Sequence, residues 1–337
     1  MNTKKLIITI IIFSNIFLLF GCIDEQNNNG KYDLYVGANL NNDFTNIQDA
    51  IDNASNGNSI FVYNGIYNEK ISINKSVKII GENYEKTILN YNGTVVNDMG
   101  IISIFADNCT IDNIKITNNI VNNLNGIVIQ SSNNTIINSS ISKTEKGIFI
   151  NSNYNINSRN NSIINNNISK NNYGIYIQYS NNNNISNNII FNNIDYGTYI
   201  LSSEDCIISY CKYYNNDVGI RLKGAKYNKI IDNNISTNDK GLYVCCGSYN
   251  NYIYHNNFID NTISSDDHYT TYYNTLESPF EGNYWSDFIP PMNSTDDFSG
   301  KDYNIPGSDG IWDNVTYNVY NGNNKDYYPY VDPIKFD

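Results

Sequence analysis

The chain has 337 residues and a formal net charge of -12, with 40% hydrophobic and 16% charged residues. Phosphate backbones and anionic membrane leaflets repel an acidic chain that has no basic patch, so we expect no nucleic acid partner. The hydrophobic content is enough to build a core, which excludes disorder over most of the chain. The length fits either two average domains or one elongated all-β unit.

The N-terminus has the pattern of an export signal. Two lysines precede the apolar run 6–20, which is shorter than the roughly 20 residues that span a membrane. The run ends in LLFGC, which resembles a lipobox, where a cysteine is lipidated and becomes the mature N-terminus. We expect a lipoprotein signal peptide at 1–21, lipid on Cys22 and a polar tether at 22–31, with the exported protein anchored to the outer face of the cytoplasmic membrane or the cell surface. An ordinary cleaved signal with a free Cys22 is the alternative.

A short helix is predicted near 46–55. Its apolar side chains Ile47, Ala50 and Ile51 share one face, and Thr45 and Gln48 fit a capping box. The pattern stops at an Asn-Gly pair, and strands are expected directly after it at 59–63, 70–73 and 77–80. A solenoid needs its open ends covered, so we expect this helix to cap the first coil.

The middle of the chain repeats a short segment with a glycine followed by alternating apolar residues. The segments NGIVI, KGIFI, YGIYI, YGTYI, VGIRL and KGLYV place their glycines 21, 27, 23, 22 and 22 residues apart. A period near 22 is typical of a solenoid. Within each unit, isoleucines alternate with polar residues in three short strands, and Asn pairs and Gly mark the corners. The sequence therefore predicts an all-β fold, a single-stranded parallel β-helix with three strands per coil.

Asparagine is expected at the corners for two reasons. It tolerates left-handed backbone angles, and stacked amides can hydrogen-bond along the axis as a ladder. The one long interval contains extra residues at 151–160, which we expect to leave the coil as a loop.

Three parts of the chain together resemble the NosD-like right-handed β-helix proteins. These proteins belong to the pectin-lyase-like superfamily and to the carbohydrate-binding and sugar-hydrolase repeat group. The three parts are the head DFTNIQDAIDNASNGNSIFVYNGIYNEKISINKSVKIIGE, the repeats and the ending GNYWSDF...DYYPY. The resemblance implies a right-handed β-helix over 32–280 and a C-terminal cap over 281–337. It also implies export. The family's namesake is an accessory protein linked to copper-site maturation of nitrous oxide reductase, and many relatives are surface proteins of unknown role.

The tail departs from the acidic run that is usual in those relatives, because the chain has GSDGIWD, with Gly307 and Trp312 at two of its positions. Its acids could still offer oxygen ligands to calcium. The candidates are Asp297, Asp302, Asp309 and Asp313. The alternative is a solvated acidic loop, with an aromatic cap on the last coil made by Trp285, Trp312, Tyr327 and Tyr328.

Copper needs imidazole or sulfur ligands, and the chain has only 2 His. These are His255 and His268. Four thiols in neighbouring coils could bind a thiophilic metal or form a disulfide: Cys206, Cys211, Cys245 and Cys246. Adjacent strand residues point to opposite faces, so Cys245 and Cys246 are not expected to share a site, and we do not expect copper. Cys109 is expected to be a small core residue.

Polysaccharide cleavage on this fold needs paired acids, or metal-binding acids with a basic side chain. The best candidates are Asp217, Arg221 and Lys223 in NDVGIRLKG, and a loop with Asp266, Asp267 and His268. No stacked acid set is evident in the neighbouring coils. A lyase, epimerase or hydrolase therefore stays the alternative, as does a NosD-like accessory role in copper-site maturation.

Glycan binding is the function that we favour. Exposed tyrosines could stack on sugar rings, although tyrosine also simply favours strands. The candidates are Tyr176, Tyr179, Tyr199, Tyr213, Tyr214, Tyr243 and Tyr252. We expect non-catalytic binding or scaffolding at the cell surface, with a surface glycan as partner, and the pattern leaves the ligand and the oligomeric state open.

Overall fold

The computed structural model describes residues 30–38, 42–91, 93, 99–118, 124–152, 158–268, 282–299 and 305–336. The chain divides into two units, Met1–Lys31 and Tyr32–Asp337, and all helices and strands given below belong to the second. The predicted signal peptide, Cys22, Asp302 and residues 153–157 of the predicted loop at 151–160 lie outside the described residues. No helix in the described ranges is both long and apolar enough to span a membrane.

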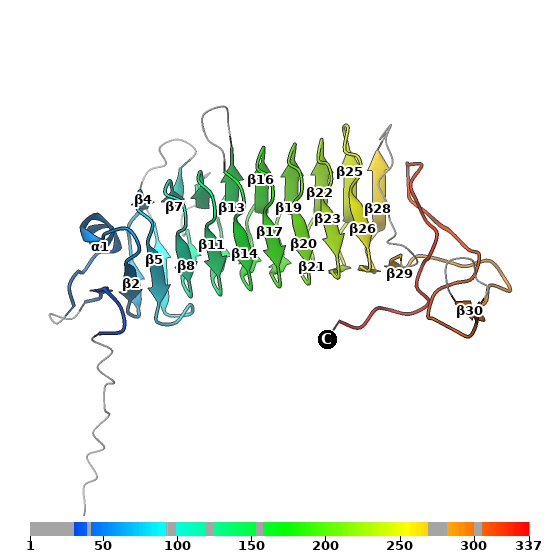
Figure 1. The fold of residues 1–337 in the computed structure, drawn as a ribbon, viewed down its shortest axis with the longest axis horizontal. Helices are drawn as coiled ribbons and strands as arrows, with labels where there is room; N and C mark the ends of the chain where they lie inside the picture. Colours follow the sequence, from blue (N-terminus) through cyan, green and yellow to red (C-terminus); the bar gives the residue numbers. More distant parts are fainter. Residues whose placement is uncertain are drawn as a thin grey trace, which may run out of the picture. The chain divides into compact units, whose positions relative to one another are not determined.

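The second unit is a parallel β-solenoid whose coils each give one strand to each of three sheets (Figure 1). In the described ranges, sheet A contains β1 (Leu34–Val36), β2 (Ser59–Val62), β5 (Lys78–Gly81), β8 (Thr110–Asp112), β11 (Thr135–Ile137), β14 (Ser162–Ile164), β17 (Asn184–Ser186), β20 (Ile207–Ser209), β23 (Lys229–Ile231) and β26 (Tyr252–Tyr254). Sheet B contains β3 (Gly65–Tyr67), β6 (Thr87–Asn90), β9 (Lys115–Thr117), β12 (Ser140–Ser142), β15 (Asn167–Ser169), β18 (Ile189–Phe191), β21 (Lys212–Tyr214), β24 (Asn234–Ser236), β27 (Asn257–Ile259) and β29 (Tyr284–Trp285). Sheet C contains β4 (Ile71–Ile73), β7 (Gly100–Ile104), β10 (Asn125–Ile129), β13 (Lys146–Asn151), β16 (Tyr173–Gln178), β19 (Tyr196–Leu201), β22 (Val218–Lys223), β25 (Lys240–Cys245) and β28 (Ile263–His268).

The predicted fold is confirmed: a right-handed parallel β-solenoid with three sheets and roughly 23 residues per coil. Register keeps like residues stacked, so that Ile163 of β14 pairs with Ile136 below it and Ile185 above it. All three side chains are fully buried. The alternation of isoleucine with polar residues therefore produces continuous isoleucine stacks inside the coil, and burial of these side chains stabilises the solenoid.

The predicted asparagine ladders exist, but each Asn pair divides the two expected roles between its members. Asn165 takes the left-handed φ of 55° at the corner, while Asn166 is buried beside it. The backbone N–H and the Nδ2 of Asn166 both donate to Oδ1 of Asn188 in the next coil, at 2.9 Å and 3.1 Å. Three such ladders run along the three corners, so the corner backbone groups are satisfied without water.

The cap helix α1 (Ile47–Asn53) lies over the first coil and buries Ile47, Ala50 and Ile51 as predicted. The predicted capping box is wrong. The N-cap is Asn46, whose side chain makes no capping hydrogen bond. Instead, the carboxylate of Glu69 accepts hydrogen bonds from the backbone N–H groups of Ile47 at 2.8 Å and Gln48 at 3.0 Å. The side chain of Gln48 is used elsewhere, because its Oε1 accepts from the backbone N–H of Ser72.

At the other end, the C-terminal segment covers the last coil with aromatic rings. Trp285 is stacked between Phe258 at 4.3 Å and Tyr317 at 4.1 Å, measured between ring centroids. Of the four aromatics predicted for this cap, Trp285 is buried, whereas Tyr327 is exposed. Two antiparallel ribbons complete the segment, β30 (Phe298–Ser299) with β31 (Ile305–Pro306) and β32 (Tyr317–Asn318) with β33 (Lys325–Asp326).

Candidate functional site

The outer face of sheet C carries the densest set of aromatic and cationic contacts in the described part of the chain. We call it the aromatic face. It consists of outward side chains on five neighbouring strands, β13 to β25: Lys146, Phe149, Tyr173, Tyr176, Tyr196, Tyr199, Arg221, Lys240 and Tyr243.

The repeat glycine shapes this face. A Cβ on Gly174 would lie 2.4 Å from the carbonyl oxygen of Gly197 in the next coil, and one on Gly197 would lie 2.5 Å from that of Gly219. Only glycine allows this close approach. The glycine also interrupts the alternation of the strand, so that both Tyr173 before it and Tyr176 after it stand on the outer face.

The rings stack on one another along the solenoid axis. Tyr176 and Tyr199 are 4.8 Å apart with an interplanar angle of 3°, and Phe149 and Tyr176 are 5.1 Å apart. This spacing is the distance between neighbouring strands. The ring faces therefore cover each other, so that Phe149 and Tyr199 are buried and Tyr176 is partly exposed. Burial raises the pKa of Tyr199 to about 12, so its hydroxyl is neutral and both donates and accepts hydrogen bonds at neutral pH.

Arg221 lies among three tyrosines of the aromatic face. Its guanidinium carbon is 5.1 Å from the ring centroids of Tyr196 and Tyr199 and 5.0 Å from that of Tyr243. Nη1 also donates to the hydroxyl of Tyr196. Lys240 extends the pattern, because its Nζ lies 4.5 Å from the ring centroid of Tyr243. The face therefore combines phenol hydroxyls with fixed positive charge.

The predicted catalytic residues lie in one coil but form no ion pair. Arg221 and Lys223 share the outer face of β22, and Asp217 lies at the corner just before that strand. Within the described residues, Asp217 makes no ion pair with either of them. The prediction of roles for these three residues stays a prediction.

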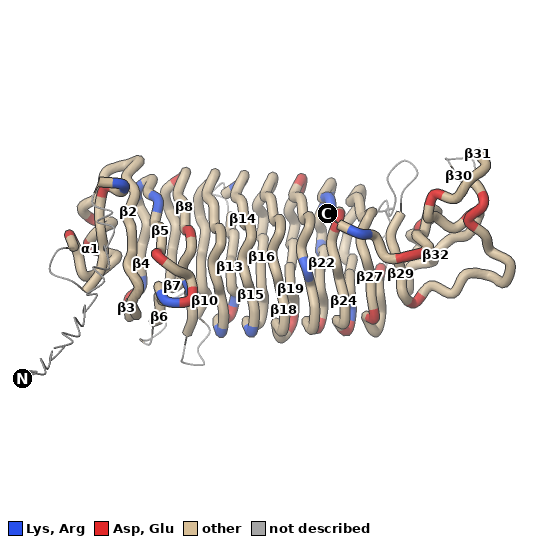
Figure 2. The backbone as a smooth tube through the Cα atoms, turned by 90° about the horizontal axis from the view of Figure 1, so that it is seen from below, with Lys and Arg blue, Asp and Glu red and all other residues tan. Residues whose placement is uncertain are grey.

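The expectation that no acids stack in the neighbouring coils is wrong. The N–H of Val218 donates to the carbonyl of Asp195, and the N–H of Lys240 donates to that of Asp217. These bonds place Asp195, Asp217 and Asp239 in successive coils at one corner. Charged residues recur along the edges of the coils in Figure 2. Burial raises the pKa of Asp217, and the carboxylates of Asp239 and Asp195 raise it further. An acid two residues before the repeat glycine was the sequence signal that marked this acid column.

Only some of the predicted sugar-binding tyrosines share a surface. Tyr176, Tyr199 and Tyr243 belong to the aromatic face, but Tyr199 is buried, so the prediction that it is exposed is wrong. Tyr213 is fully buried and its hydroxyl bonds Thr198 at 2.9 Å, so the prediction that it is exposed is wrong. The others stand elsewhere: Tyr214 on sheet B, Tyr252 on sheet A and Tyr179 at a corner.

The acids of the tail organise its backbone. The Oδ2 of Asp313 accepts from the N–H groups of Asp297 at 2.7 Å and Phe298 at 3.2 Å, and the Oδ1 of Asp309 accepts from the N–H of Ile311. The predicted loop with Asp266, Asp267 and His268 is instead the end of strand β28. Its two acids bind Lys240 and the cap residues Asn321 and Asn324.

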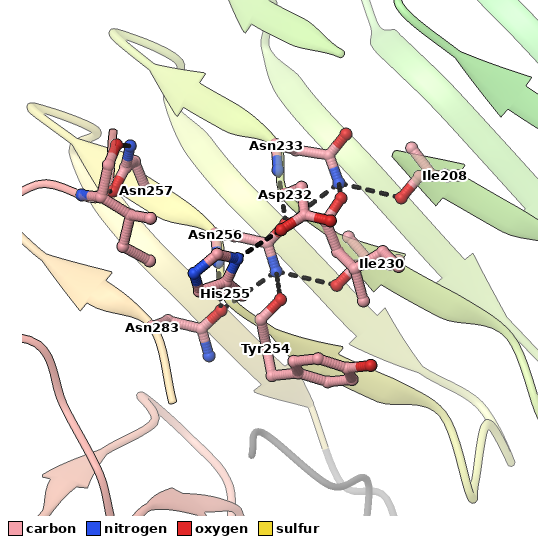
Figure 3. Close-up of polar contacts among 11 residues, drawn as sticks. Ile208, Ile230, Asp232, Asn233, Tyr254, His255, Asn256, Asn257 and Asn283 are labelled. Carbon is pink, nitrogen blue, oxygen red and sulfur yellow. Dashed lines mark hydrogen bonds and ion pairs between the residues drawn. The ribbon is translucent and has the colours of Figure 1, made fainter. Parts of the chain in front are cut away.

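The sulfur and imidazole groups do not gather into a metal site. Cys206 and Cys211 occupy ladder positions in two different corners, and burial raises the pKa of each thiol to about 11. His255 pairs with Asp232 beside the ladder of Asn233 and Asn256 (Figure 3). In the described ranges, no three His, Cys, Asp or Glu side chains are placed to hold a metal ion. The donor set described does not fit copper, and the calcium set, which includes Asp302, stays a prediction.

A hollow of about 400 Å³ lies beside the Asp232–His255 pair, between sheet B and the C-terminal tail. The tail is held there by Asn257, whose side chain makes two hydrogen bonds of 2.8 Å with the backbone of Ile334. Phe336 contacts the rings of Tyr210 and His255 edge-on. The hollow is thus a product of the tail packing against the coils.

The sequence and the fold were compared with known proteins. A family described as periplasmic copper-binding protein (NosD) matches residues 51–289. No curated protein sequence matches the chain. Among solved structures, pectate lyase Pel9A is similar with a TM-score of 0.52 and 14% identity over 80% of this chain and 83% of its own. A polygalacturonase from Erwinia carotovora ssp. carotovora has a TM-score of 0.54 and 13% identity, and the match covers 72% of this chain and 85% of the enzyme. DFA-IIIase from Arthrobacter chlorophenolicus A6 has a TM-score of 0.53 and 11% identity, and the match covers 67% of this chain and 68% of the enzyme. At these identities the likeness concerns the fold alone.

Proposed function

The chain belongs to the NosD family, and we propose that it is a non-catalytic glycan-binding protein, lipid-anchored through Cys22 outside the cytoplasm. The family is described as periplasmic, which agrees with the predicted export. Its description also names copper, for which the described residues supply no suitable donor set.

The observation that carries the proposal is the aromatic face, which places an aromatic or basic side chain at the same strand position in five coils in register. A glycan chain also repeats, and it presents hydroxyl groups that need both donors and acceptors. The phenol hydroxyls supply both, Arg221 and Lys240 supply charged donors, and the acid column supplies acceptors. Because the rings cover each other's faces, the sugar is held by ring edges and polar groups. This differs from the face-to-face stacking expected from the sequence.

The proposal is tested on a glycan array, followed by titration of the ligand that binds. Arg221→Gln removes the central charge of the aromatic face, and loss of one charge-assisted hydrogen bond should weaken binding about tenfold or more. Lys229→Gln is the matched control, because Lys229 is an exposed cation on sheet A. Equal affinities for the two variants, with unchanged circular dichroism, would contradict binding at the aromatic face.

The acid column favours a second candidate, cleavage of a polysaccharide. Neighbouring strands are about 4.8 Å apart, so the stacked acids are close to the carboxyl spacing of about 5–5.5 Å that retaining glycosidases use. Like charges at this spacing favour one protonated partner, the state that a general acid requires. The raised pKa of Asp217 agrees with this role.

Incubation with acidic polysaccharides and calcium separates the two candidates. As a binder, the purified protein should give neither unsaturated product nor chain shortening. Turnover by the wild type that is lost in Asp217→Asn would replace the binding proposal with an enzymatic one.

A further inference from the structure

The two adjacent cysteines at the end of β25 lie where the strand enters a corner turn, and the positive φ of this corner recurs in the three preceding coils. Cys246 and Gly247 have φ values of +58° and +81°, the signs that the two central residues of a type I′ turn require. Asn, Asp and Gly usually fill such positions, because a side chain at positive φ is strained. In the three preceding coils the residues at the place of Cys246 are Tyr179, Ser202 and Gly224.

The turn brings the two thiols together. Because the backbone of Cys246 is in the left-handed region, its side chain points towards that of Cys245. The two Sγ atoms are 2.7 Å apart. The expectation that these neighbours point to opposite faces is therefore wrong. Cys245 is buried, and Cys246 is exposed. The carbonyl of Cys245 fixes the turn by accepting from the Oγ of Ser248 at 2.9 Å and its N–H at 3.3 Å.

The other described cysteines behave differently. Cys109, Cys206 and Cys211 are buried, and each takes one ladder position at a corner. Their sulfur atoms contact backbone carbonyls and asparagine amides. Of the described thiols, only Cys246 is exposed, and a second thiol stands directly behind it.

We propose that Cys245 and Cys246 form a dithiol–disulfide couple, which closes to a vicinal disulfide when it meets a disulfide oxidant. The geometry that carries the proposal is the close approach of the two sulfur atoms in a fixed turn, with one of them open to solvent. A disulfide bond is about 2.05 Å long, so the two sulfur atoms must move closer to bond. Consecutive Cα atoms are about 3.8 Å apart, closer than in most disulfides, so closure also adjusts the backbone of the turn. The oxidising conditions outside the cytoplasm supply such oxidants.

The reaction proceeds in two exchanges. The exposed thiolate of Cys246 attacks one sulfur of an oxidant R–S–S–R, forming a mixed disulfide and releasing one thiolate R–S⁻. Cys245 then loses its proton and attacks the sulfur of Cys246, which forms the bond between the two residues and releases the second R–S⁻. The protein loses two protons and two electrons, and the oxidant is reduced to two thiols once the released thiolates take up protons.

The environment of Cys245 sets the rate of the second step. Burial and the neighbouring thiol raise its pKa to about 11, while the guanidinium of Arg221, whose Nη2 lies 3.8 Å from Sγ, favours the thiolate. Ring closure should therefore accelerate as pH rises, because more of Cys245 is deprotonated.

The test exposes the full-length protein to oxidised glutathione, blocks free thiols with iodoacetamide and analyses the chymotryptic peptide between Tyr243 and Tyr249 by mass spectrometry. We expect this peptide to be two hydrogen atoms lighter than the reduced form, with loss of alkylation at both cysteines, and to recover both alkylation sites after reduction. Cys206 and Cys211 serve as internal controls, since burial should leave them unchanged.

Two variants locate the steps. Cys245→Ser should accumulate glutathione on Cys246, because the resolving thiol is gone, and Cys246→Ser should leave Cys245 unmodified, because its sulfur is buried. Alkylation of both thiols in the oxidised wild type, a stable glutathione adduct on Cys246, or a disulfide between two chains would overturn the proposal. A metal ion that blocks both thiols without oxidant would overturn it as well.

Discussion

At each corner of the solenoid, two adjacent residues have different roles: one takes the left-handed backbone angle, and the other makes the hydrogen bonds of the ladder. Asn187 has the left-handed φ of 57°, which glycine could also adopt, whereas Asn188 is buried and bonded to Asn166 in the preceding coil and to Cys211 in the following coil. The same position in the next coil is Cys211, whose sulfur takes the place of the amide oxygen at 3.4 Å from the N–H of Asn188. The ladder thus tolerates an isolated weaker acceptor.

Replacing a ladder residue tests this division. Asn188→Ala leaves the N–H of Asn166 buried without its acceptor, and we expect a loss of about 2–4 kcal/mol in the free energy of unfolding. Asn188→Cys should cost less, because sulfur still accepts. Asn187→Gly, measured by the same urea titration, should be close to neutral. If Asn187→Gly cost as much as Asn188→Ala, the assignment of roles would be reversed.

Asp326, which hydrogen-bonds the last residue of a ladder, Asn283, makes the stability of the fold depend on pH. It is fully buried, accepts hydrogen bonds from Trp285 Nε1 and the N–H of Asn283 at 2.7 Å each, and burial raises its pKa to about 7. An unfolded aspartate titrates near 3.9, so the folded state binds this proton more tightly. The stability from this group is complete below about pH 4 and is lost as pH rises to about 7.

We therefore expect the free energy of unfolding to fall between pH 5 and pH 7, by at most about 1.4 kcal/mol per pH unit from this group. Asp326→Asn, which does not titrate, should remove that part of the slope in thermal unfolding scans at the two pH values. Identical slopes for the wild type and the variant would show that the carboxylate does not titrate in this range.

At the scale of elements, the position of α1 follows from its apolar face, but its N-terminal cap does not. The helix and its capping residue Glu69 are separated by the two strands β2 and β3, and a local capping motif cannot reveal such a partner. The acid column was missed for a similar reason. Its members interact across coils, and Asn172 interrupts the series between Glu145 and Asp195, so one coil alone shows a single acid.

The cap contact makes a direct prediction. Glu69→Gln removes the negative charge and one of the two oxygen acceptors at the helix N-terminus, and should lower the free energy of unfolding by about 1 kcal/mol. Glu85→Gln, at an exposed turn residue, is the control for the loss of charge. A loss confined to Glu85→Gln in the same denaturation experiment would refute the capping role.

At the scale of the whole molecule, the repeat was enough to predict the solenoid. Every coil meets the same packing problem, so the same residues recur, and the period of isoleucine and asparagine reports the fold directly. What departs from the repeat could not be predicted in this way. Tyr213 replaces a core isoleucine, pairing with Ile190 and Ile235. Cys246 places a thiol beside Cys245 at a left-handed corner position where the preceding coils have no cysteine.

Anchoring also belongs to this scale. Because Cys22 ends a lipobox-like signal, Cys22→Ser should move the protein from the membrane fraction to the soluble fraction after cell lysis. Wild-type protein fractionated in parallel is the control. If the variant stayed in the membrane fraction like the wild type, the lipoprotein prediction would be wrong.

If a glycan binds along the aromatic face, removal of the hydroxyl groups of Tyr173 and Tyr196 should weaken its binding. In Tyr173→Phe/Tyr196→Phe the rings and their contact remain, while two hydroxyl groups and the hydrogen bond from Arg221 to Tyr196 are lost. Loss of two hydrogen bonds should weaken the affinity of the glycan by about tenfold or more in calorimetric titration. The matched control is Tyr214→Phe, at a tyrosine stacked on Phe191 at 4.9 Å on sheet B. Weaker binding in the double variant alone is the predicted result, and wild-type affinity in the double variant would contradict the claim.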